Sequence, residues 1–227
     1  MVGAPSNDLD QGAAYVFTID ANNSWAEQAL LTASDATAGA RFGHSVALSR
    51  WTGAYALGPP WPTSGPTLDP TADAFLTVGT KVTVDVLNVV VGAPLHPTGG
   101  AVDAGQAYVF HCDSTGTGYV EDAVLTPSTG AVAGDEFGSS VDVDANHVVV
   151  GAPGLDFDIF VDAGGAFLYT ADVPTTWSET DLLRASESQD GAEAGGAVGI
   201  SGPHALMGAQ HHNNAPGSGY VWAYFGW

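Results

Sequence analysis

The chain has 227 residues, and 25 Asp and Glu against 4 Lys and Arg give it a formal net charge of −21. A field of this sign repels nucleic-acid phosphates and anionic membrane surfaces, which argues against both as partners. No apolar run is long enough for membrane insertion, and the single cysteine, Cys112, cannot form an internal disulfide. The acidic composition fits an extracellular or cell-surface protein, and adaptation to salt would produce the same composition.

The chain begins with two short sequence motifs, called phrases below, that recur along it. Val-Gly-Ala-Pro begins at Val2, and Gly12 then leads into an aromatic strand at 13–19. The first phrase recurs at Val91–Pro94 and Val150–Pro153, and in altered form at Met207–Gln210. The second phrase recurs at Gly105–Phe110, Gly164–Tyr169 and Gly217–Trp222. Internal repetition of this kind indicates a repeat architecture.

A third phrase, Phe-Gly followed by two further residues and then valine, lies between the other two. Its copies are Phe42–Val46, Phe137–Val141 and the degraded Ala194–Val198. The Val-Gly-Ala-Pro glycines are 59 residues apart between Gly92 and Gly151, and 57 apart between Gly151 and Gly208. A near-constant period of this length predicts one supersecondary unit per repeat, in the size range of a propeller blade.

Each repeat is predicted to supply four short strands, bounded by Gly and Pro and rich in β-branched and aromatic residues. No segment shows helical periodicity with caps at both ends. The expected strands are 13–19, 29–32, 45–49 and 86–92, then 106–112, 120–126, 140–143 and 147–151, then 166–171, 177–184, 197–201 and 205–208, and finally 219–225. Because one four-stranded sheet cannot bury both its faces, neighbouring sheets must stack, and the predicted fold class is an all-β propeller of antiparallel blades.

The whole chain, 1–227, is expected to be one propeller segment. The repeat phrases cover 3–49 plus 86–94, 105–153 and 164–210, with a partial copy at 217–227. This is enough for a partial propeller of three to four blades, unless strands from the two ends pair and close a small ring. An open arc would expose apolar faces at its ends, which self-association or missing flanking blades would cover.

One insertion, at about 50–85, interrupts the first repeat. It contains Trp51, Tyr55 and Trp61 among several prolines, and it lies in a hairpin expected at the propeller rim. Long rim loops often carry binding sites, and aromatic side chains are frequent contact residues. These three residues are therefore candidates for partner binding, and a loosely packed decoration is the alternative.

Phe-Gly followed by Val-Gly-Ala-Pro resembles the FG-GAP repeat of integrin α chains and of many secreted microbial proteins. The bacterial type, with a Trp before Leu-x-Ala-Ser, is the most similar: Trp25 precedes Leu31–Ser34, and Trp177 precedes Leu183–Ser186. The resemblance spans nearly the whole chain outside the insertion. It implies a β-propeller, which in this family usually closes with about seven blades.

The resemblance also implies a function. It suggests a non-catalytic extracellular or cell-surface module for adhesion or for recognition of a protein or glycan ligand. Some propellers of the family flank phospholipase-type enzymes, so the second hypothesis is an accessory module of a secreted hydrolase whose catalytic domain lies outside this chain.

Calcium is the cofactor that the resemblance implies, because integrin-type repeats carry an Asp-rich loop between Phe-Gly and Gly-Ala-Pro. Asp142, Asp144 and Asn146 occupy the corresponding segment, with oxygen donors at alternate positions. The glycine and the closing acid of such a loop are absent, so an ordinary hairpin is the alternative.

A second acidic position lies two residues before the aromatic-strand glycine, at Asp10, Asp103 and Asp162. Asp156 and Asp158 add carboxylates to the loop of Asp162, which makes these three residues candidates for weak cation binding. In the alternative, each Asp accepts a backbone hydrogen bond from two residues ahead and so stabilises its turn.

The chain is predicted not to be an enzyme. Of its seven histidines only His211 and His212 are adjacent, and neighbouring side chains on an extended segment point to opposite faces. No His-Glu-x-x-His or Gly-x-Ser-x-Gly motif is present, and no glycine cluster matches a phosphate-binding loop.

Overall fold

The computed structural model describes residues 1–56, 81–112, 118–173, 176–211 and 220–225. Apart from one turn of 3-10 helix, η1 (Thr98–Gly100), the regular structure of these residues consists of strands in four antiparallel sheets. The first sheet holds β1 (Val2–Ala4), β2 (Ala13–Ile19) and β3 (Trp25–Leu31), and the second holds β4 (Ser45–Ala56), β5 (Lys81–Ala93), β6 (Gln106–Cys112) and β7 (Tyr119–Leu125). The third holds β8 (Ser140–Asp144), β9 (His147–Ala152), β10 (Gly165–Val173) and β11 (Thr176–Leu183), and the fourth holds β12 (Ala197–Ser201), β13 (His204–Ala209) and β14 (Tyr220–Phe225).

The all-β prediction is confirmed, and each predicted strand has a counterpart in the structure. The largest differences are at β4, which runs to Ala56 although it was expected to end at 49, and at β5, which begins at Lys81 although it was expected from 86. In addition, β3 begins at Trp25, whereas the strand was expected from 29. Trp25 pairs with Ile19, and a shift of register between Val16 and Phe17 lets the two strands stay paired over this extra length. The bulge adds twist to the hairpin without ending it.

The sheets are out of phase with the sequence repeats. In the third sheet, β8 and β9 come from the second repeat, whereas β10 and β11 come from the third. The chain leaves β9 at Ala152 and returns as β10, whose Gly165 pairs with Ala152, so consecutive strands form a simple meander. As a consequence, the first sheet has no strand before β1, and the fourth has none after β14 among the described residues.

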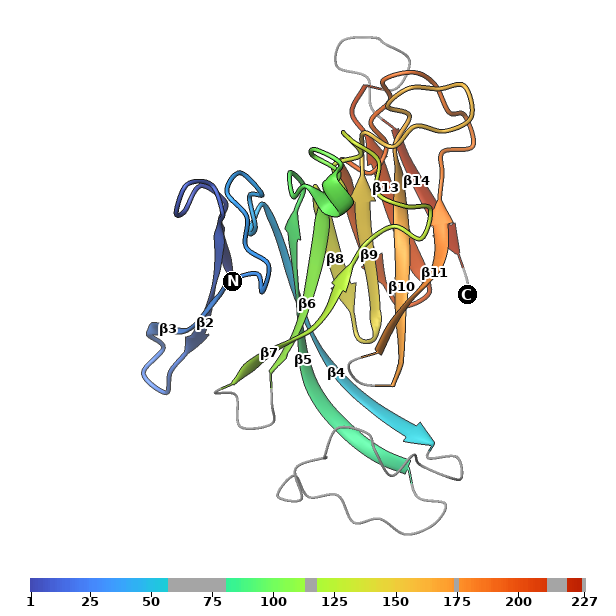
Figure 1. The fold of residues 1–227 in the computed structure, drawn as a ribbon. Helices are drawn as coiled ribbons and strands as arrows, with labels where there is room; N and C mark the ends of the chain where they lie inside the picture. The colour runs from blue at the N-terminus through green and yellow to red at the C-terminus, as the bar shows by residue number, and fades with distance from the viewer. Residues whose placement is uncertain (57–80, 113–117, 174–175, 212–219, 226–227) are drawn as a thin grey trace, which may run out of the picture.

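The four sheets stand side by side in chain order, with the first and the fourth at opposite ends of the row (Figure 1). The strands that begin the second, third and fourth sheets, β4, β8 and β12, pack against one another in succession. No strand of the first sheet pairs with a strand of the fourth in the described part of the chain. These residues therefore form an open arc of blades.

Three apolar cores lie between consecutive sheets. In the core between the first and second sheets, the Phe42 ring packs edge-on against Tyr108 and Phe110, with ring centroids 5.2 and 6.1 Å away. Phe137 makes the same contacts in the next core, and Ala194 occupies the equivalent place in the last. The phenylalanine of each Phe-Gly phrase thus fills the space between two blades, where edge-to-face ring contacts are favourable.

Candidate functional site

The repeat phrases are the joints between neighbouring sheets. Gly12 forms a parallel bridge with Phe42, and the Phe42 N–H donates a hydrogen bond to the Gln11 carbonyl, 3.0 Å away. The same bridge joins Gly105 to Phe137 and Gly164 to Ala194. Gly12 has a φ of 89°, a left-handed conformation that glycine adopts without strain.

The Val-Gly-Ala-Pro glycine is required for close approach of backbone to backbone. A Cβ added at Gly151 would overlap the carbonyl oxygen of Gly195, the glycine of the next sheet's phrase. The same overlap arises between Gly92 and Gly138 and between Gly3 and Gly43. The glycines of all three phrases therefore lie where consecutive blades touch.

The structure gives a different role to the regular aspartate before each aromatic strand. Asp10, Asp103 and Asp162 have left-handed φ values of 60°, 54° and 50°. Their main-chain carbonyls accept hydrogen bonds across the blade boundary, at 2.8, 3.0 and 3.0 Å, from the N–H groups of Arg41, Glu136 and Glu193. Among the described residues, none of the three carboxylates accepts a bond from two residues ahead. Aspartate suits this position because it tolerates the left-handed region better than most residues.

Asp142, Asp144 and Asn146 lie in and beside the β8–β9 hairpin, where their side chains contact backbone. The Asp142 carboxylate accepts a hydrogen bond from the Ile200 N–H at 2.8 Å, and the Asp144 carboxylate accepts one from the Gly202 N–H at 2.6 Å. Both bonds join the third sheet to the fourth. The Asn146 amide instead donates to the Ala171 carbonyl at 3.0 Å. The structure thus shows that the three side chains support the blades.

The second acidic set lies in the exposed loop between β9 and β10. The Asp156 carboxylate accepts a hydrogen bond from the Asp162 N–H at 2.9 Å, and Asp158 has a left-handed φ of 54°. Across the described residues, no three His, Cys, Asp or Glu side chains form a group that could hold a metal ion. Calcium binding at either acidic set stays a prediction.

One carboxyl group that the sequence did not single out is deeply buried. Asp135 is only 2% exposed, beside the Phe-Gly phrase of the third sheet. Burial, opposed by a hydrogen bond from the Val132 N–H and assisted by the nearby Asp156 charge, raises the pKa of Asp135 to about 6. Asp135 lies near the end of the loop between β7 and β8, and its raised pKa makes it a structural group that responds to pH.

The described ends of the insertion belong to a long two-stranded ribbon. β4 and β5 pair continuously from Ser45 and Gly92 to Ala56 and Lys81, whereas β6 pairs with β5 only between Leu87 and Ala93. The ribbon curves away from the row of sheets beyond the end of β6 (Figure 1). Residues 50–56 and 81–85, which were expected to belong to the insertion loop, thus extend strands β4 and β5.

The three aromatic candidates in the insertion fall on different parts of it. Trp51 lies at the base of the ribbon, half-buried, with its backbone paired to Val86. Tyr55 lies near the end of β4, with its backbone paired to Val82. Trp61 lies outside the described residues. A partner-binding site formed by these three side chains therefore stays a prediction.

The FG-GAP repeat family model matches residues 25–56 and 119–169. These two regions of the chain are FG-GAP repeats. The first match runs from β3 to the end of β4, and the second runs from β7 into β10. No curated protein matches the chain.

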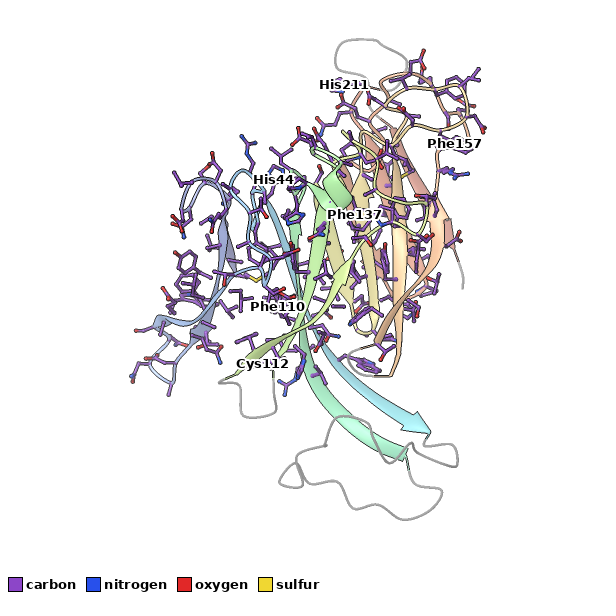
Figure 2. All side chains as sticks on the ribbon, in the orientation of Figure 1. His44, Phe110, Cys112, Phe137, Phe157 and His211 are labelled. Carbon is purple, nitrogen blue, oxygen red and sulfur yellow. The ribbon has the colours of Figure 1, made fainter. Side chains whose placement is uncertain are left out.

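The FG-GAP repeats thus place the Phe-Gly and Gly-Ala-Pro phrases at blade boundaries, where they act in packing. The histidines near these boundaries do not converge. His211 lies 2.8 Å from the Glu193 carboxylate, His111 lies 2.6 Å from Asp122, and His96 is buried near Asp35. Figure 2 shows His44, Cys112 and His211 on separate parts of the molecule.

No described helix is long and apolar enough to cross a membrane.

Proposed function

We propose that this FG-GAP propeller segment is a non-catalytic extracellular recognition module that binds a protein or glycan ligand through the β4–β5 ribbon. The observation that carries the proposal is the length of the ribbon. β4 and β5 have 12 and 13 residues, whereas the equivalent β8 and β9 have 5 and 6. The extra length extends past β6 and pairs with no third strand in the part of the chain that the structure describes.

Blade stability does not require this extension. A two-stranded ribbon is only marginally stable by itself, so ordering its extra residues has a cost in conformational entropy. The equivalent β8–β9 hairpin closes with the two residues Ala145 and Asn146 between the paired Asp144 and His147. An extension with this cost is best explained by a contact outside the chain, and rim elements carry binding sites in many folds.

The ribbon also has the geometry of a binding element. Beyond Leu87, β5 pairs only with β4 among the described residues, so its outer edge offers backbone N–H and C=O groups to a further strand. An extended peptide can add to such an edge, with main-chain hydrogen bonds that give affinity. The half-buried Trp51 at the base offers an aromatic contact for either a peptide or a sugar ring.

A shortened variant tests the proposal, because the chain supplies its own template. Replacing 50–87 by Ala-Asn joins Ser49 to Asn88 through the turn of the β8–β9 hairpin, since Ser49 pairs with Asn88 as Asp144 pairs with His147. The labelled parent chain is expected to bind a subset of an array of glycans and purified extracellular proteins. The shortened chain should lose that binding while keeping the circular dichroism of a β protein. Undiminished binding by the folded variant would overturn the proposal, as would a parent chain that binds no probe on the array.

A Trp51→Ala variant serves as the second arm. It leaves the ribbon in place and removes the aromatic surface at its base. Binding weakened by at least about tenfold would assign Trp51 to the contact. Unchanged binding would place the contact on the ribbon edge, and the shortened variant would then carry the test alone.

A further inference from the structure

Each blade boundary is built from two faces of defined composition. We call the face that a sheet turns toward the next sheet in the chain its trailing face, and the opposite one its leading face. Two positions of each trailing face enter the core. One lies two residues before the Val-Gly-Ala-Pro glycine, and the other lies four residues after the aromatic-strand glycine. They are Val90 and Val109 in the second sheet and Val149 and Leu168 in the third, with exposures of 0%, 0%, 0% and 3%.

The trailing face of the fourth sheet carries the same two positions but nothing covers them in the described part of the chain. Leu206 lies two residues before Gly208, and Val221 lies four after Gly217. Their exposures are 47% and 69%. These apolar side chains therefore face solvent in positions where every equivalent residue of the second and third sheets is buried.

The leading face of the first sheet is open in the same way. Val2 precedes its phrase glycine as Val91 and Val150 do, and it is 55% exposed whereas the other two are fully buried. Tyr15 is half-buried, although its equivalent Tyr108 is 0% exposed under the Phe42 ring. The first and fourth sheets thus each carry an open apolar face, made of residues equivalent to those that meet at the three internal boundaries.

We propose that two copies of this chain associate through these faces. The trailing face of one copy packs on the leading face of the next. The strands that carry them, β13 and β14 on one side and β1 and β2 on the other, occupy matching blade positions. The three internal boundaries show that such faces are complementary in shape and in residue type. The contact is heterologous, and it closes into a ring or continues as a chain of copies. It is independent of the β4–β5 ribbon.

Electrostatics sets the conditions for this association. Each copy carries a net charge of −21, so two copies repel each other at low ionic strength. Salt screens the repulsion and strengthens apolar burial. Association is therefore expected to increase with NaCl concentration, which is opposite to the behaviour of a contact held by ion pairs.

Sedimentation of mixed variants tests the proposal sharply. Val2→Asp blocks the leading face, and a Leu206→Asp/Val221→Asp double variant blocks the trailing face. Each is expected to weaken association by at least about tenfold, because the contact would bury an unpaired carboxylate. An equimolar mixture should form a dimer, since one open face of each kind remains. Val120→Asp is the matched control, because Val120 on β7 is also 55% exposed and lies away from both end faces.

The outcomes are distinct. A parent chain that stays monomeric at high concentration and high salt would overturn the proposal, as would a mixture that fails to form dimers when the parent associates. If one blocked variant still associates with itself, the contact joins two like faces and the head-to-tail arrangement is wrong. Circular dichroism and melting of each variant show whether loss of association reflects loss of the fold.

Discussion

Glu121 and Ser34 join the second sheet to the first through two hydrogen bonds to a single carboxylate. The Ser34 hydroxyl donates at 2.6 Å and its backbone N–H donates at 3.0 Å. Ser128 and Glu179 repeat the arrangement one blade later, at 2.6 and 2.7 Å. In both cases the serine lies shortly after the outermost strand of one sheet. The glutamate lies on the outermost strand of the next sheet.

We expect Glu121→Ala to destabilise the fold by about 1–2 kcal/mol, because a carboxylate that accepts two hydrogen bonds is lost at a partly exposed site. Glu27 is the matched control. It occupies the same place on β3 but has no side-chain hydrogen bond among the described residues, so Glu27→Ala should cost less than about 0.5 kcal/mol. Urea unfolding of the two variants measures the difference, and equal costs would show that the serine contact is not the cause.

Gly151→Ala should destabilise the chain by at least about 3 kcal/mol, because the new methyl group would overlap the Gly195 carbonyl at the blade boundary. Gly199→Ala is the control: an added Cβ there meets only the Asp142 carboxylate, at an ordinary contact distance of 3.8 Å. Thermal unfolding should show a large loss for the first variant and a small change for the second. A mild effect at Gly151 would mean that neighbouring blades can separate without cost.

Asp135→Asn should stabilise the protein at neutral pH. The folded-state pKa of Asp135 is about 6, above its ordinary value of 3.8, so the folded chain binds its proton more tightly than the unfolded chain does. The stabilisation from this group is complete below pH 3.8 and disappears as pH rises to about 6. The variant avoids this loss, and its advantage should grow across that window to about 1–2 kcal/mol. Denaturant midpoints at several pH values check the result, and a constant difference would contradict it.

Asp142→Ala and Asp144→Ala should each cost about 1–2 kcal/mol, since each leaves a backbone N–H of the fourth sheet without its acceptor. The cost should be the same with calcium and with a chelator. Asp181→Ala is a suitable control, because that carboxylate accepts a bond only from the adjacent Leu182 N–H. A cost that appears only with calcium would show that these two residues serve mainly as metal ligands.

The exposed loop with Asp156, Asp158 and Asp162 needs a separate test of calcium binding. If it is a site, calorimetric titration of the parent chain with calcium should release or absorb heat, and an Asp156→Ala/Asp158→Ala double variant should remove that heat. The hydrogen bond from the Asp162 N–H to Asp156 would be lost as well, so unfolding is measured in parallel. The absence of calcium heat in the parent chain would end this hypothesis.

Several features were predictable because they repeat. Periodic glycines and aromatic strands identified the blades, and the strand positions followed from β-branched runs such as that before Gly151. The acidic residues were harder to interpret. The regular Asp10, Asp103 and Asp162 stand out in the sequence, but whether their side chains or their backbone conformations matter depends on φ and on the partner across the boundary.

The Ser34–Glu121 pair joins residues 87 positions apart, and no local pattern brings them together. The same holds for Asp142, whose partner Ile200 lies 58 positions away. Repeats reveal which residues are equivalent, since equivalence is a property of order along the chain. Only the tertiary structure decided which strands share a sheet, which faces remain open and which carboxylates accept a hydrogen bond. The reason is that packing joins half of each repeat to half of the next.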